Sequence, residues 1–427
     1  MCVFAVDGFS VRQQESERLY DKNFILAIVG QTLFTLANTL MVHYNRWIEF
    51  IGGNVEQVGS IMSIGSVIGL FLRPWIGSLI NRFGPRVMWM VGYVVFGVGS
   101  LGGLVFDKLD LSIYILRSLL VLGAAIVFSS SLTYVTLTTS VKRRTEAIGI
   151  LGVGGFLGFL FGPFLGDLIL DREVRTEQQF AVLFVVTSAA LIVPMCLAFC
   201  LRRPPSLTGN HRVYKRGFFA NVLEFWPGTI LLCGCAFGVC MTVPLAFLAS
   251  YVDELKLQIP GMSTLGIYFA CYAGWGLIVR IGFRHLPDRI GRRKVLLAGL
   301  LVMSAGMFCH LPVTASQPWL LVIPGLLCGT GHALVYYTMA ALTLETFPQE
   351  VRGTGSSLSM MMFDMGFVVG SFILGMLAER YGFDSLFIAT GCFVLVVAMI
   401  YAGSSVPVWR RRQTQVVTRI EGTDERR

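Results

Sequence analysis

Two parts of this chain, 207 positions apart, carry the same short pattern, and each copy lies between segments apolar enough to cross a membrane. The first copy runs from Arg73 to Arg86 and the second from Arg280 to Arg293. About 20 apolar residues, rising 1.5 Å each, span a hydrocarbon core of ~30 Å. The chain is therefore predicted to be a duplicated membrane protein, an architecture in which a substrate site often lies between two parallel repeats.

The composition places the whole chain in a bilayer. Hydrophobic residues make up 55% and charged residues 14%, against roughly 25% charged residues in a soluble domain. The apolar segments are continuous and do not alternate at every second residue, which favours helices over barrel strands. We predict an all-α membrane protein with twelve transmembrane helices in two pseudo-symmetric six-helix halves, near residues 23–42, 55–79, 87–106, 111–139, 147–167, 180–201, 228–251, 262–283, 294–311, 318–343, 354–378 and 383–403.

These spans divide the chain into five parts. Proline, glycine and charged residues mark the segment after residue 201 as a connector. We expect a short interfacial helix from Phe218 to Trp226. The expected parts are an N-terminal tail (1–22), a first half (23–201), a linker (202–227), a second half (228–403) and a C-terminal tail (404–427).

The distribution of basic residues predicts the orientation. The tails, the linker and the loops after even-numbered spans hold 25 Lys and Arg when Lys294, the first residue of the ninth span, is counted with them, while the loops after odd-numbered spans hold 6. Basic loops stay on the cytoplasmic side, so both termini are expected there, in a multi-pass protein of the cell (inner) membrane. This bias accounts for the net charge of +9, and we expect no nucleic-acid partner.

The sequence offers no pattern for an enzyme, a cofactor or a metal. It has no Gly-Lys pair for a phosphate-binding loop and no His-Glu metal pattern. Nine of the ten cysteines lie in apolar spans and are expected to fill the core. Any energy for pumping must therefore come from an ion gradient or another subunit.

The repeated loop resembles the signature of the major facilitator superfamily, Gly-x-Leu-x-Asp-Arg-x-Gly-Arg-Arg. The matching residues are Gly77, Leu79, Arg82, Gly84 and Arg86 in the first copy and Asp288, Arg289, Gly291, Arg292 and Arg293 in the second. Asn81 replaces the acid, Pro85 the first basic residue, and Arg284 the glycine of the second copy. The resemblance implies the twelve-helix fold and a gating role for this loop, with a lock weakened at Asn81. The alternative is that these residues only fix the topology.

The fifth span resembles the antiporter signature of the same family. The matching positions, in which only the final glycine of the signature is replaced, are Gly149, Gly158, Gly162, Pro163 and Gly166. Glycines at four-residue spacing let helices approach closely. The resemblance implies packing between the halves and export rather than uptake; the alternative is an ordinary glycine-rich helix. The eleventh span keeps the spacing in Gly366 and Gly370, with Ser371 where Pro163 stands.

Three ionisable residues inside the spans are candidates for proton coupling. Asp364 lies about ten residues into the eleventh span, near mid-depth, and a buried carboxyl group can load and release protons. Arg117 resembles an arginine of the family's fourth span that is implicated in proton coupling. His332 in the tenth span is a weaker candidate. The alternative for all three is a structural role, as a buried pair, a snorkelling side chain or a hydrogen-bonded core residue.

Charged residues at the cytoplasmic ends of the spans are candidates for an inner gate. Glu345 and Arg352 follow the tenth span and resemble a gating loop of the family. The first-half counterpart comprises Lys142, Arg143, Arg144 and Glu146. The alternative is that these charges only set the topology.

The family places the first, fourth, seventh and tenth spans around the substrate path. Polar and aromatic candidates in them are Gln31, Asn38, Ser130, Tyr134, Thr242, Tyr336 and Tyr337. The 32 phenylalanines and 17 methionines suit an apolar, adaptable pocket or, alternatively, a lipid-facing surface.

The resemblance implies a secondary transporter that exports small organic or amphipathic compounds in exchange for protons by alternating access. The expected partners are a small-molecule substrate, protons and the lipid bilayer, and the expected state is a monomer without a cofactor. Two alternatives stay open. One is an uptake symporter or facilitator for a metabolite, and the other is a membrane sensor or scaffold without transport.

Overall fold

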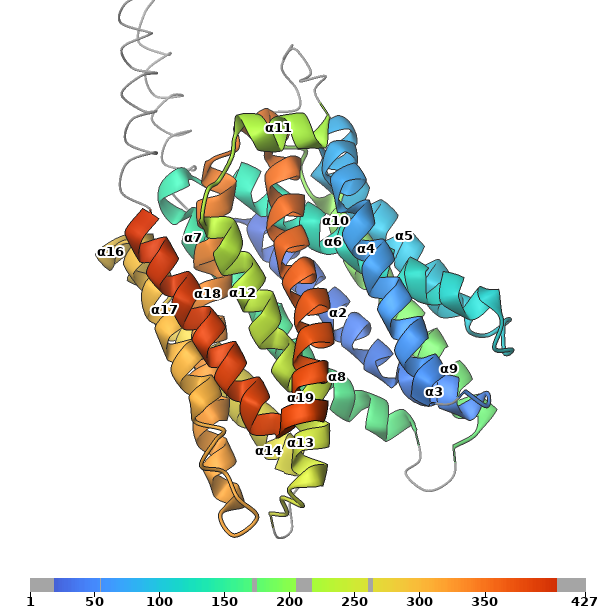
Figure 1. The fold of residues 1–427 in the computed structure, drawn as a ribbon. Helices are drawn as coiled ribbons and strands as arrows, with labels where there is room; N and C mark the ends of the chain where they lie inside the picture. The colour runs from blue at the N-terminus through green and yellow to red at the C-terminus, as the bar shows by residue number, and fades with distance from the viewer. Residues whose placement is uncertain (1–18, 54, 171–174, 205–216, 260–263, 405–427) are drawn as a thin grey trace, which may run out of the picture.

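The computed structural model describes residues 19–53, 55–170, 175–204, 217–259 and 264–404, and the elements in them are helices (Figure 1). A helix satisfies its own backbone hydrogen bonds, which a lipid environment requires. Residues 1–18 and 405–427 of the predicted tails lie outside these ranges, as do residues 205–216 of the predicted linker and residues 262 and 263 of the predicted eighth span.

The first half is built from eleven helical segments. They are α2 (Lys22–Leu40), η1 (Met41–His43), α3 (Tyr44–Phe50), α4 (Val55–Phe83), α5 (Pro85–Gly102), α6 (Leu111–Thr138), η2 (Val141–Arg143), α7 (Arg144–Leu151), α8 (Val153–Ile169), α9 (Glu177–Ala189) and α10 (Ile192–Cys200). Side-chain caps fix several starts. Asp21 accepts a hydrogen bond from the backbone N–H of Phe24 at 2.8 Å, and Asp110 does the same for Ser112.

The second half follows a short helix that lies across one end of the bundle (Figure 1). Its segments are α11 (Phe218–Glu224), α12 (Ile230–Thr242), η4 (Val243–Phe247), α13 (Leu248–Glu254), α14 (Thr264–Phe269), η5 (Ala270–Gly274), α15 (Trp275–Gly282), α16 (Leu286–Ile290), α17 (Arg292–Phe308), η6 (Pro318–Leu321), α18 (Val322–Glu345), η7 (Gln349–Val351) and α19 (Arg352–Ser404). Segments η4 and η5 are π-helical. The helix expected near Phe218 is confirmed as α11, and its Phe219 and Leu223 are exposed.

Nine helical stretches are long and apolar enough to count as candidate membrane spans in the described ranges. The sequence predicts twelve. The predicted third and ninth spans coincide with α5 and α17, which are not among the nine. The last two predicted spans both fall in α19, which counts once although Gly382 interrupts it with a φ of 78°. The helical class is confirmed, and the count of twelve stays a prediction.

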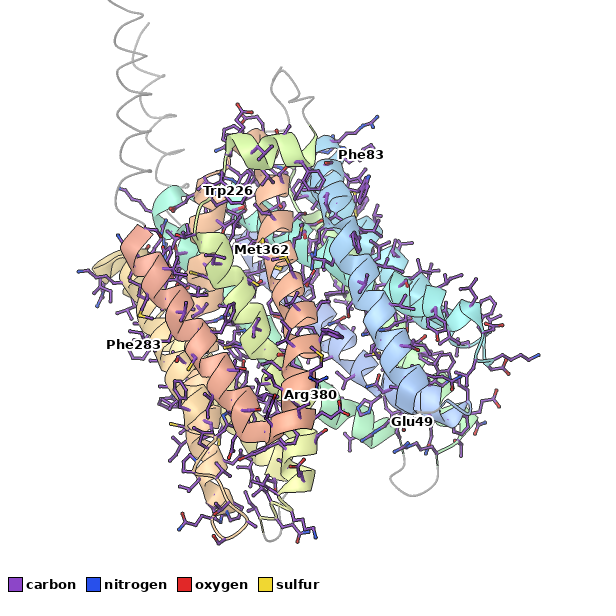
Figure 2. All side chains as sticks on the ribbon, viewed as in Figure 1. Glu49, Phe83, Trp226, Phe283, Met362 and Arg380 are labelled. Atoms are coloured by element: carbon purple, nitrogen blue, oxygen red, sulfur yellow. The ribbon has the colours of Figure 1, made fainter. Side chains whose placement is uncertain are left out.

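Two glycine turns define one end of the bundle. Gly84 and Gly291 adopt φ values of 86° and 96°, which glycine tolerates and other residues rarely adopt. Each turn lets a helix of the repeated pattern reverse into the next one. We call this end the basic end, because it also carries the later arginines of both patterns, Arg82, Arg86, Arg289, Arg292 and Arg293. Phe83 and Trp226 mark it in Figure 2, and Glu49 and Arg380 lie toward the opposite end.

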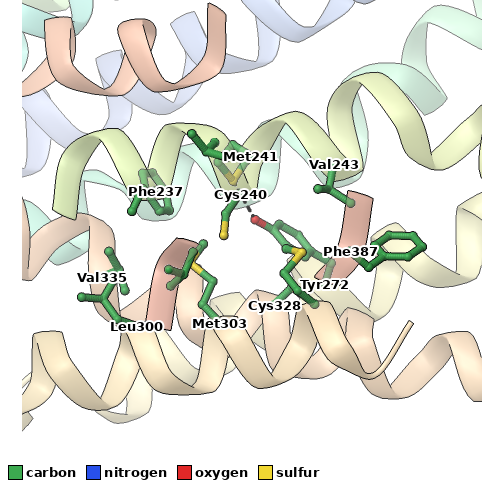
Figure 3. Close-up of a cluster of buried hydrophobic side chains, with 14 of the residues drawn as sticks. Phe237, Cys240, Met241, Val243, Tyr272, Leu300, Met303, Cys328, Val335 and Phe387 are labelled. Carbon is green, nitrogen blue, oxygen red and sulfur yellow. Dashed lines mark hydrogen bonds between the residues drawn. The ribbon is translucent and has the colours of Figure 1, made fainter. Parts of the chain in front are cut away.

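Each half packs around its own core. The core of the first half includes Phe34, Trp89 and Tyr93. The core of the second half surrounds Tyr272 and Met303 with small thiols and aliphatic side chains (Figure 3). The halves meet where α4 and α6 pack against α19 and where α7 packs against α18.

The cysteines only partly match the expected core role. Cys233, Cys240 and Cys328 are buried, but Cys196, Cys200 and Cys392 are exposed, so the core prediction is wrong for these last three. In helices of a bilayer protein, lipid is as apolar as the core, so an apolar residue does not reveal which of the two it faces.

Candidate functional site

An ion pair joins the two halves near mid-depth. Arg73 on α4 donates from Nε to Oδ2 of Asp364 on α19 at 2.7 Å. The side chain of Arg73 is 6% exposed and that of Asp364 is 23% exposed. Arg73 also donates from Nη1 to the carbonyl oxygen of Ala125 at 3.1 Å and to the hydroxyl of Ser129 at 2.9 Å. Eleven residues separate Arg73 from Gly84, so the pair lies about 16 Å from the basic end.

The partner of Asp364 was missed by the sequence analysis. In the sequence, Arg73 stands out only as the first residue of a repeated pattern. The signal used for Arg117, a charged residue inside an apolar span, applied equally to Arg73 and Arg280. A carboxylate and a guanidinium held together inside a membrane protein stabilise each other, and removing one partner leaves an uncompensated buried charge.

Arg280 occupies the place in the second half that Arg73 holds in the first. It is 1% exposed and donates from Nη2 to the carbonyl oxygens of His332 and Ala333 at 3.2 and 3.3 Å. Its guanidinium carbon lies 4.8 Å from the ring centroid of Phe156 and 5.5 Å from that of Tyr336. Among the described residues, no carboxylate pairs with it.

His332 lies beside Arg280 in an aromatic cluster. Its Nδ1 is 2.7 Å from the hydroxyl of Tyr272, which belongs to the π-helical segment η5. The rings of Phe156 and Phe237 lie 4.7 and 5.0 Å from the imidazole. π-helical turns frequently occur at functional sites, because they reorient side chains within a helix. The cluster therefore joins a residue of the first half, Phe156, to three helices of the second half.

Arg117 lies apart from this centre. Its guanidinium carbon is 5.8 Å from the ring centroid of Tyr44, and its Nε has no hydrogen-bond partner in the described part of the chain. It stands eight residues before Ala125 on α6, or about 12 Å along the helix. The structure does not bring Arg117 and Asp364 into contact.

Four of the seven candidates for the substrate path lie on α2, α6 and α12. Gln31 and Ser130 are buried, with Oε1 and Oγ lacking a partner among the described atoms. Thr242 is satisfied locally, since its hydroxyl donates to the carbonyl oxygen of Val239. Tyr134 belongs to the core of the first half, and its hydroxyl donates to the carbonyl oxygen of Arg202 at 3.0 Å.

The other three path candidates lie along α2 and α18. Asn38 is half-buried on α2. Tyr336 faces Phe237 at 6.0 Å between ring centroids, and Tyr337 is 1% exposed in a small cluster between the halves that includes Ile148.

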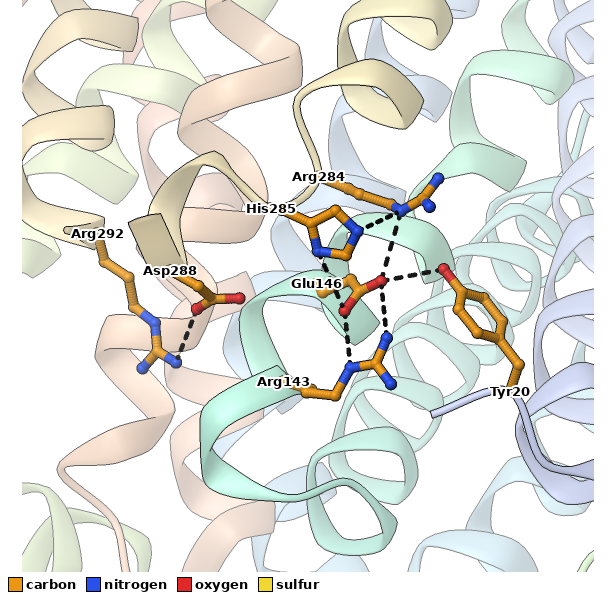
Figure 4. Close-up of polar contacts among 7 residues, drawn as sticks. All are labelled: Tyr20, Arg143, Glu146, Arg284, His285, Asp288 and Arg292. Carbon is orange, nitrogen blue, oxygen red and sulfur yellow. Dashed lines mark hydrogen bonds and ion pairs between the residues drawn. The ribbon is translucent and has the colours of Figure 1, made fainter. Parts of the chain in front are cut away.

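A buried carboxylate at the basic end collects contacts from both halves (Figure 4). Glu146 on α7 is 1% exposed and binds Arg143 through two hydrogen bonds of 3.0 and 3.2 Å. Arg284 and His285 of the second half approach it at 3.5 and 3.6 Å. The hydroxyl of Tyr20 donates to it at 3.1 Å. The first-half cluster expected at the inner gate is therefore joined to the repeated loop of the second half.

The first copy of the loop meets the second half through neutral groups. Asn81 donates from Nδ2 to the hydroxyl of Thr354 at 2.8 Å, at the start of α19. A Cβ added at Gly77 would lie 3.1 Å from the carbonyl oxygen of Gly353, so this glycine lets α4 approach α19 closely. The residue that replaces the family's acid thus makes an uncharged contact between the halves.

The remaining charged residues at the basic end form contacts both within the second half and across the two halves. Arg292 pairs with Asp288 at 3.5 Å and with Glu345. Partial burial raises the pKa of Asp288 above its ordinary value. Arg352 donates across the halves to the carbonyl oxygen of Thr136 at 3.0 Å.

Two arginines of the repeats cap helix ends in the same way. Arg86 donates to the carbonyl oxygens of Ala198 and Phe199 at the end of α10, and Arg293 donates to that of Ala402 near the end of α19. Cations at helix C-termini satisfy orphan carbonyls and favour the helix dipole. Arg82 and Arg289 are exposed.

The glycines of the fifth-span pattern face two neighbours. Cβ atoms added at Gly158, Gly162 and Gly166 would collide with Thr35, Thr39 and His43 of the first half. Gly149 instead faces Tyr337 of the second half, at 3.5 Å. Pro163 lies within α8, and its side chain is outside the described set. The pattern serves mainly to pack α8 on α2, and only its first glycine lies between the halves.

Comparisons with known proteins agree with this architecture. The family model described as Major Facilitator Superfamily matches residues 23–286 and 283–419. The multidrug resistance protein MdtG of Escherichia fergusonii is 25% identical over 421 residues, which cover 93% of this chain and 97% of that protein.

Two solved structures share the fold. A bacterial homologue of the iron transporter ferroportin, in its outward-facing state, superimposes with a TM-score of 0.75 at 14% identity, covering 90% of this chain and 99% of that one. The E. coli fucose:proton symporter FucP gives a TM-score of 0.73 at 16% identity, covering 91% and 100%. Since the family model matches nearly the whole chain, this protein belongs to the Major Facilitator Superfamily and is a multi-pass membrane transporter rather than an enzyme.

Proposed function

We propose that this protein is a proton-coupled exporter of small organic or amphipathic compounds, working by alternating access as a monomer in the cell (inner) membrane. The observation that carries the proposal is the ion pair between Arg73 and Asp364, a titratable link between the two halves. Similarity to proteins named for multidrug resistance supports export. FucP, which is named as a symporter, shares only the fold, so direction is a proposal.

The chain crosses the membrane twelve times, with the basic end in the cytoplasm. Gly382 breaks α19 into two segments, each long enough for a span, and α5 and α17 are helices of 18 and 17 residues. The described ends of the chain, Leu19 and Ser404, both lie near the basic end, because Tyr20 contacts Glu146 there and Ser404 follows the carbonyl that Arg293 caps. The excess of arginine at this end supports its cytoplasmic placement.

The proton acts by removing one charge of the pair. In the state described, the side chain of Asp364 holds α19 to α4 through Arg73, and contacts from Glu146 and Asn81 close the basic end. A proton that enters from the opposite side neutralises the Asp364 carboxylate, and the attraction to Arg73 is lost. Arg73 keeps its hydrogen bonds to Ala125 and Ser129. The halves then separate at the basic end, the proton leaves to the cytoplasm, and substrate enters.

The test uses everted vesicles with an acid interior and a pH-sensitive dye. Amphipathic acids, amphipathic cations, metal chelators and sugars are added in turn. We expect at least one compound to dissipate the gradient with the wild-type protein and with Glu379→Gln, a control on the same helix that changes an exposed carboxylate. We expect Asp364→Asn to abolish the response.

Three results would contradict this proposal. A response that survives Asp364→Asn keeps antiport but moves coupling to Arg117 or His332. Uptake of a substrate together with protons would favour a symporter. No flux of any compound by folded protein would favour the sensor or scaffold. The double variant Arg73→Gln/Asp364→Asn removes both charges, and it replaces the single variant where that one does not fold.

A further inference from the structure

Arg280 is the duplicate of Arg73 and sits in the same backbone setting. The two arginines are 207 positions apart, and so are the residues whose carbonyl oxygens they bind, Ala125 and His332. Each arginine lies eleven residues before the glycine turn of its repeat, so both are at about the same depth. The duplication has therefore kept, in each half, the backbone carbonyl oxygen that accepts a hydrogen bond from the guanidinium.

The duplication has not kept the carboxylate. The glycine pairs at 158–162 and 366–370 have the same internal spacing and lie 208 positions apart, one more than the two arginines, and the residues two positions before them are Phe156 and Asp364. Asp364 lies 2.7 Å from Arg73, whereas the ring of Phe156 lies 4.8 Å from the guanidinium of Arg280. A ring face thus replaces an anion at the matching position of the second half.

The hydrogen bonds of Arg280 remain incomplete. Its Nε has no acceptor among the described residues, although the side chain is 1% exposed. An arginine has five N–H donors in a planar fork that matches a carboxylate or phosphate. Burying this cation with rings and two carbonyl oxygens is costly in an apolar bundle unless an anion completes the set at some stage of the cycle.

The surroundings indicate what kind of anion fits. Phe156, Phe237 and Tyr336 surround the guanidinium and the neighbouring His332, so the site is apolar apart from its charged centre. The ring centroid of Phe237 lies 5.5 Å from that of Phe363, the residue before Asp364, which places the site next to the ion pair between the halves. An aromatic or aliphatic body with one acidic group matches this environment.

The covering of Arg280 indicates from which side it is reached. Phe156 lies over the guanidinium, and a Cβ added at Gly152 would lie 2.0 Å from its Nη1. Both residues belong to the first half and Arg280 to the second. Contacts at the basic end hold the halves together in this state, so separation there uncovers Arg280 toward the side proposed to be cytoplasmic.

We propose that Arg280, with Tyr336 and His332, binds the acidic group of an amphipathic organic anion and that such anions are the substrates of this transporter. The inference rests on the proposed transport function but not on proton coupling. It assigns the acid to a site loaded from the basic end. Amphipathic cations, which the apolar cluster alone would accept, are excluded by the positive charge of Arg280.

The test compares two probes with the same ring system and opposite charge, 2-naphthoate and 2-naphthylmethylammonium. Their binding to the purified full-length protein is measured by equilibrium dialysis at neutral pH. We expect the wild type to prefer the acid, and Arg280→Gln to weaken acid binding by at least about tenfold, since a charge-assisted hydrogen bond is lost. Arg380→Gln, which removes an exposed arginine of the same half, is expected to leave both affinities unchanged.

A further variant, Arg280→Lys, separates a loss of binding from a loss of folding. It retains the positive charge but loses the planar fork, so we expect the preference for the acid to fall without vanishing. The proposal is overturned if the acid fails to bind the wild type at millimolar concentration, if the cation is preferred, or if Arg280→Gln binds the acid normally. Acid binding that depends on Arg280 without any proton flux would overturn proton coupling alone.

Discussion

Arg73 and Arg280 show how two copies of one pattern acquired different chemistry. Both lie at about the same depth. Arg73 donates to a carbonyl oxygen of α6, and Arg280 donates to the carbonyl oxygen at the corresponding position of α18. The next contact differs. Arg73 donates to the hydroxyl of Ser129, and the residue 207 positions later is Tyr336, whose ring lies 5.5 Å from Arg280. Arg73 forms an ion pair with Asp364, whereas the guanidinium of Arg280 is surrounded by aromatic rings.

The difference separates two tasks that a transporter must perform. A carboxylate beside an arginine gives a group that a proton can neutralise, and this group is placed where it links the halves. In the proposed mechanism, Arg280, which has no carboxylate partner among the described residues, keeps its charge for an anionic substrate. The duplicated backbone supplies both positions, and the residue two positions before the glycine pair, Asp364 or Phe156, gives each its proposed task.

The largest effect is expected from removing one charge of the first-half pair. Asp364→Asn strands the guanidinium of Arg73 inside the bundle, which we expect to cost about 3–5 kcal/mol of stability. Unfolding of the purified protein in mixed micelles measures this cost. The variant Arg73→Gln/Asp364→Asn should recover most of it. A double variant as unstable as the single one would show that the pair is not the source of the loss.

A second change would give the second half a carboxylate like that of the first half. Phe156→Glu places a carboxylate over Arg280, at the position that corresponds to Asp364. We expect 2-naphthoate to bind about tenfold more weakly, because the internal carboxylate competes for the guanidinium. Phe156→Leu is the matched control, which removes the ring without adding a charge. Equal affinities for the Glu and Leu variants would mean that Arg280 does not bind the acid.

A smaller effect on stability is expected at Arg280 itself. Arg280→Met removes a buried cation with no carboxylate to strand, so the lost cation–π contacts are offset by the relief of desolvation. We expect a change within about 1 kcal/mol. The same unfolding measurement as for Asp364→Asn gives the comparison directly. A loss as large as that of Asp364→Asn would reveal an anionic partner in the folded protein.

The smallest effect is expected at the gate. Asn81→Asp puts a negative charge beside Thr354 at the start of α19, where the helix dipole favours anions. We expect the state closed at the basic end to gain about 0.3–1 kcal/mol. Distances between spin labels across that end, on α4 and α19, report the populations of the two states. A shift toward the open state would show that repulsion by other groups outweighs the dipole.

Much of the fold was predictable because it depends on local properties. The long apolar segments predict the helices, and Gly84 and Gly291 of the repeated loop adopt the positive φ values that glycine tolerates in a tight turn. The duplication could be predicted from the repeated pattern and its spacing of 207 positions alone. The depth of Asp364 followed from its position in the eleventh span. These features need only the length of a helix and the conformational freedom of glycine.

The partners of the site residues were not predictable in the same way. A helix that is apolar on all sides carries no stripe to show which face meets a neighbour. Packing therefore decided that Asp364 meets Arg73, 291 positions away, and that Tyr134 turns into the core of the first half. It also decided that three glycines of the fifth-span pattern face α2 and η1.

The sequence by itself determined the helices, the repeat and the charges that lie inside the membrane. Only the tertiary structure decided which of those charges are neutralised, because ion pairing depends on distances between helices that are far apart in the chain. Arg73 and Arg280 begin the two copies of one pattern in the sequence. The neighbour that packing brings to each, Asp364 or Phe156, makes one a link between the halves and leaves the other without a carboxylate among the described residues.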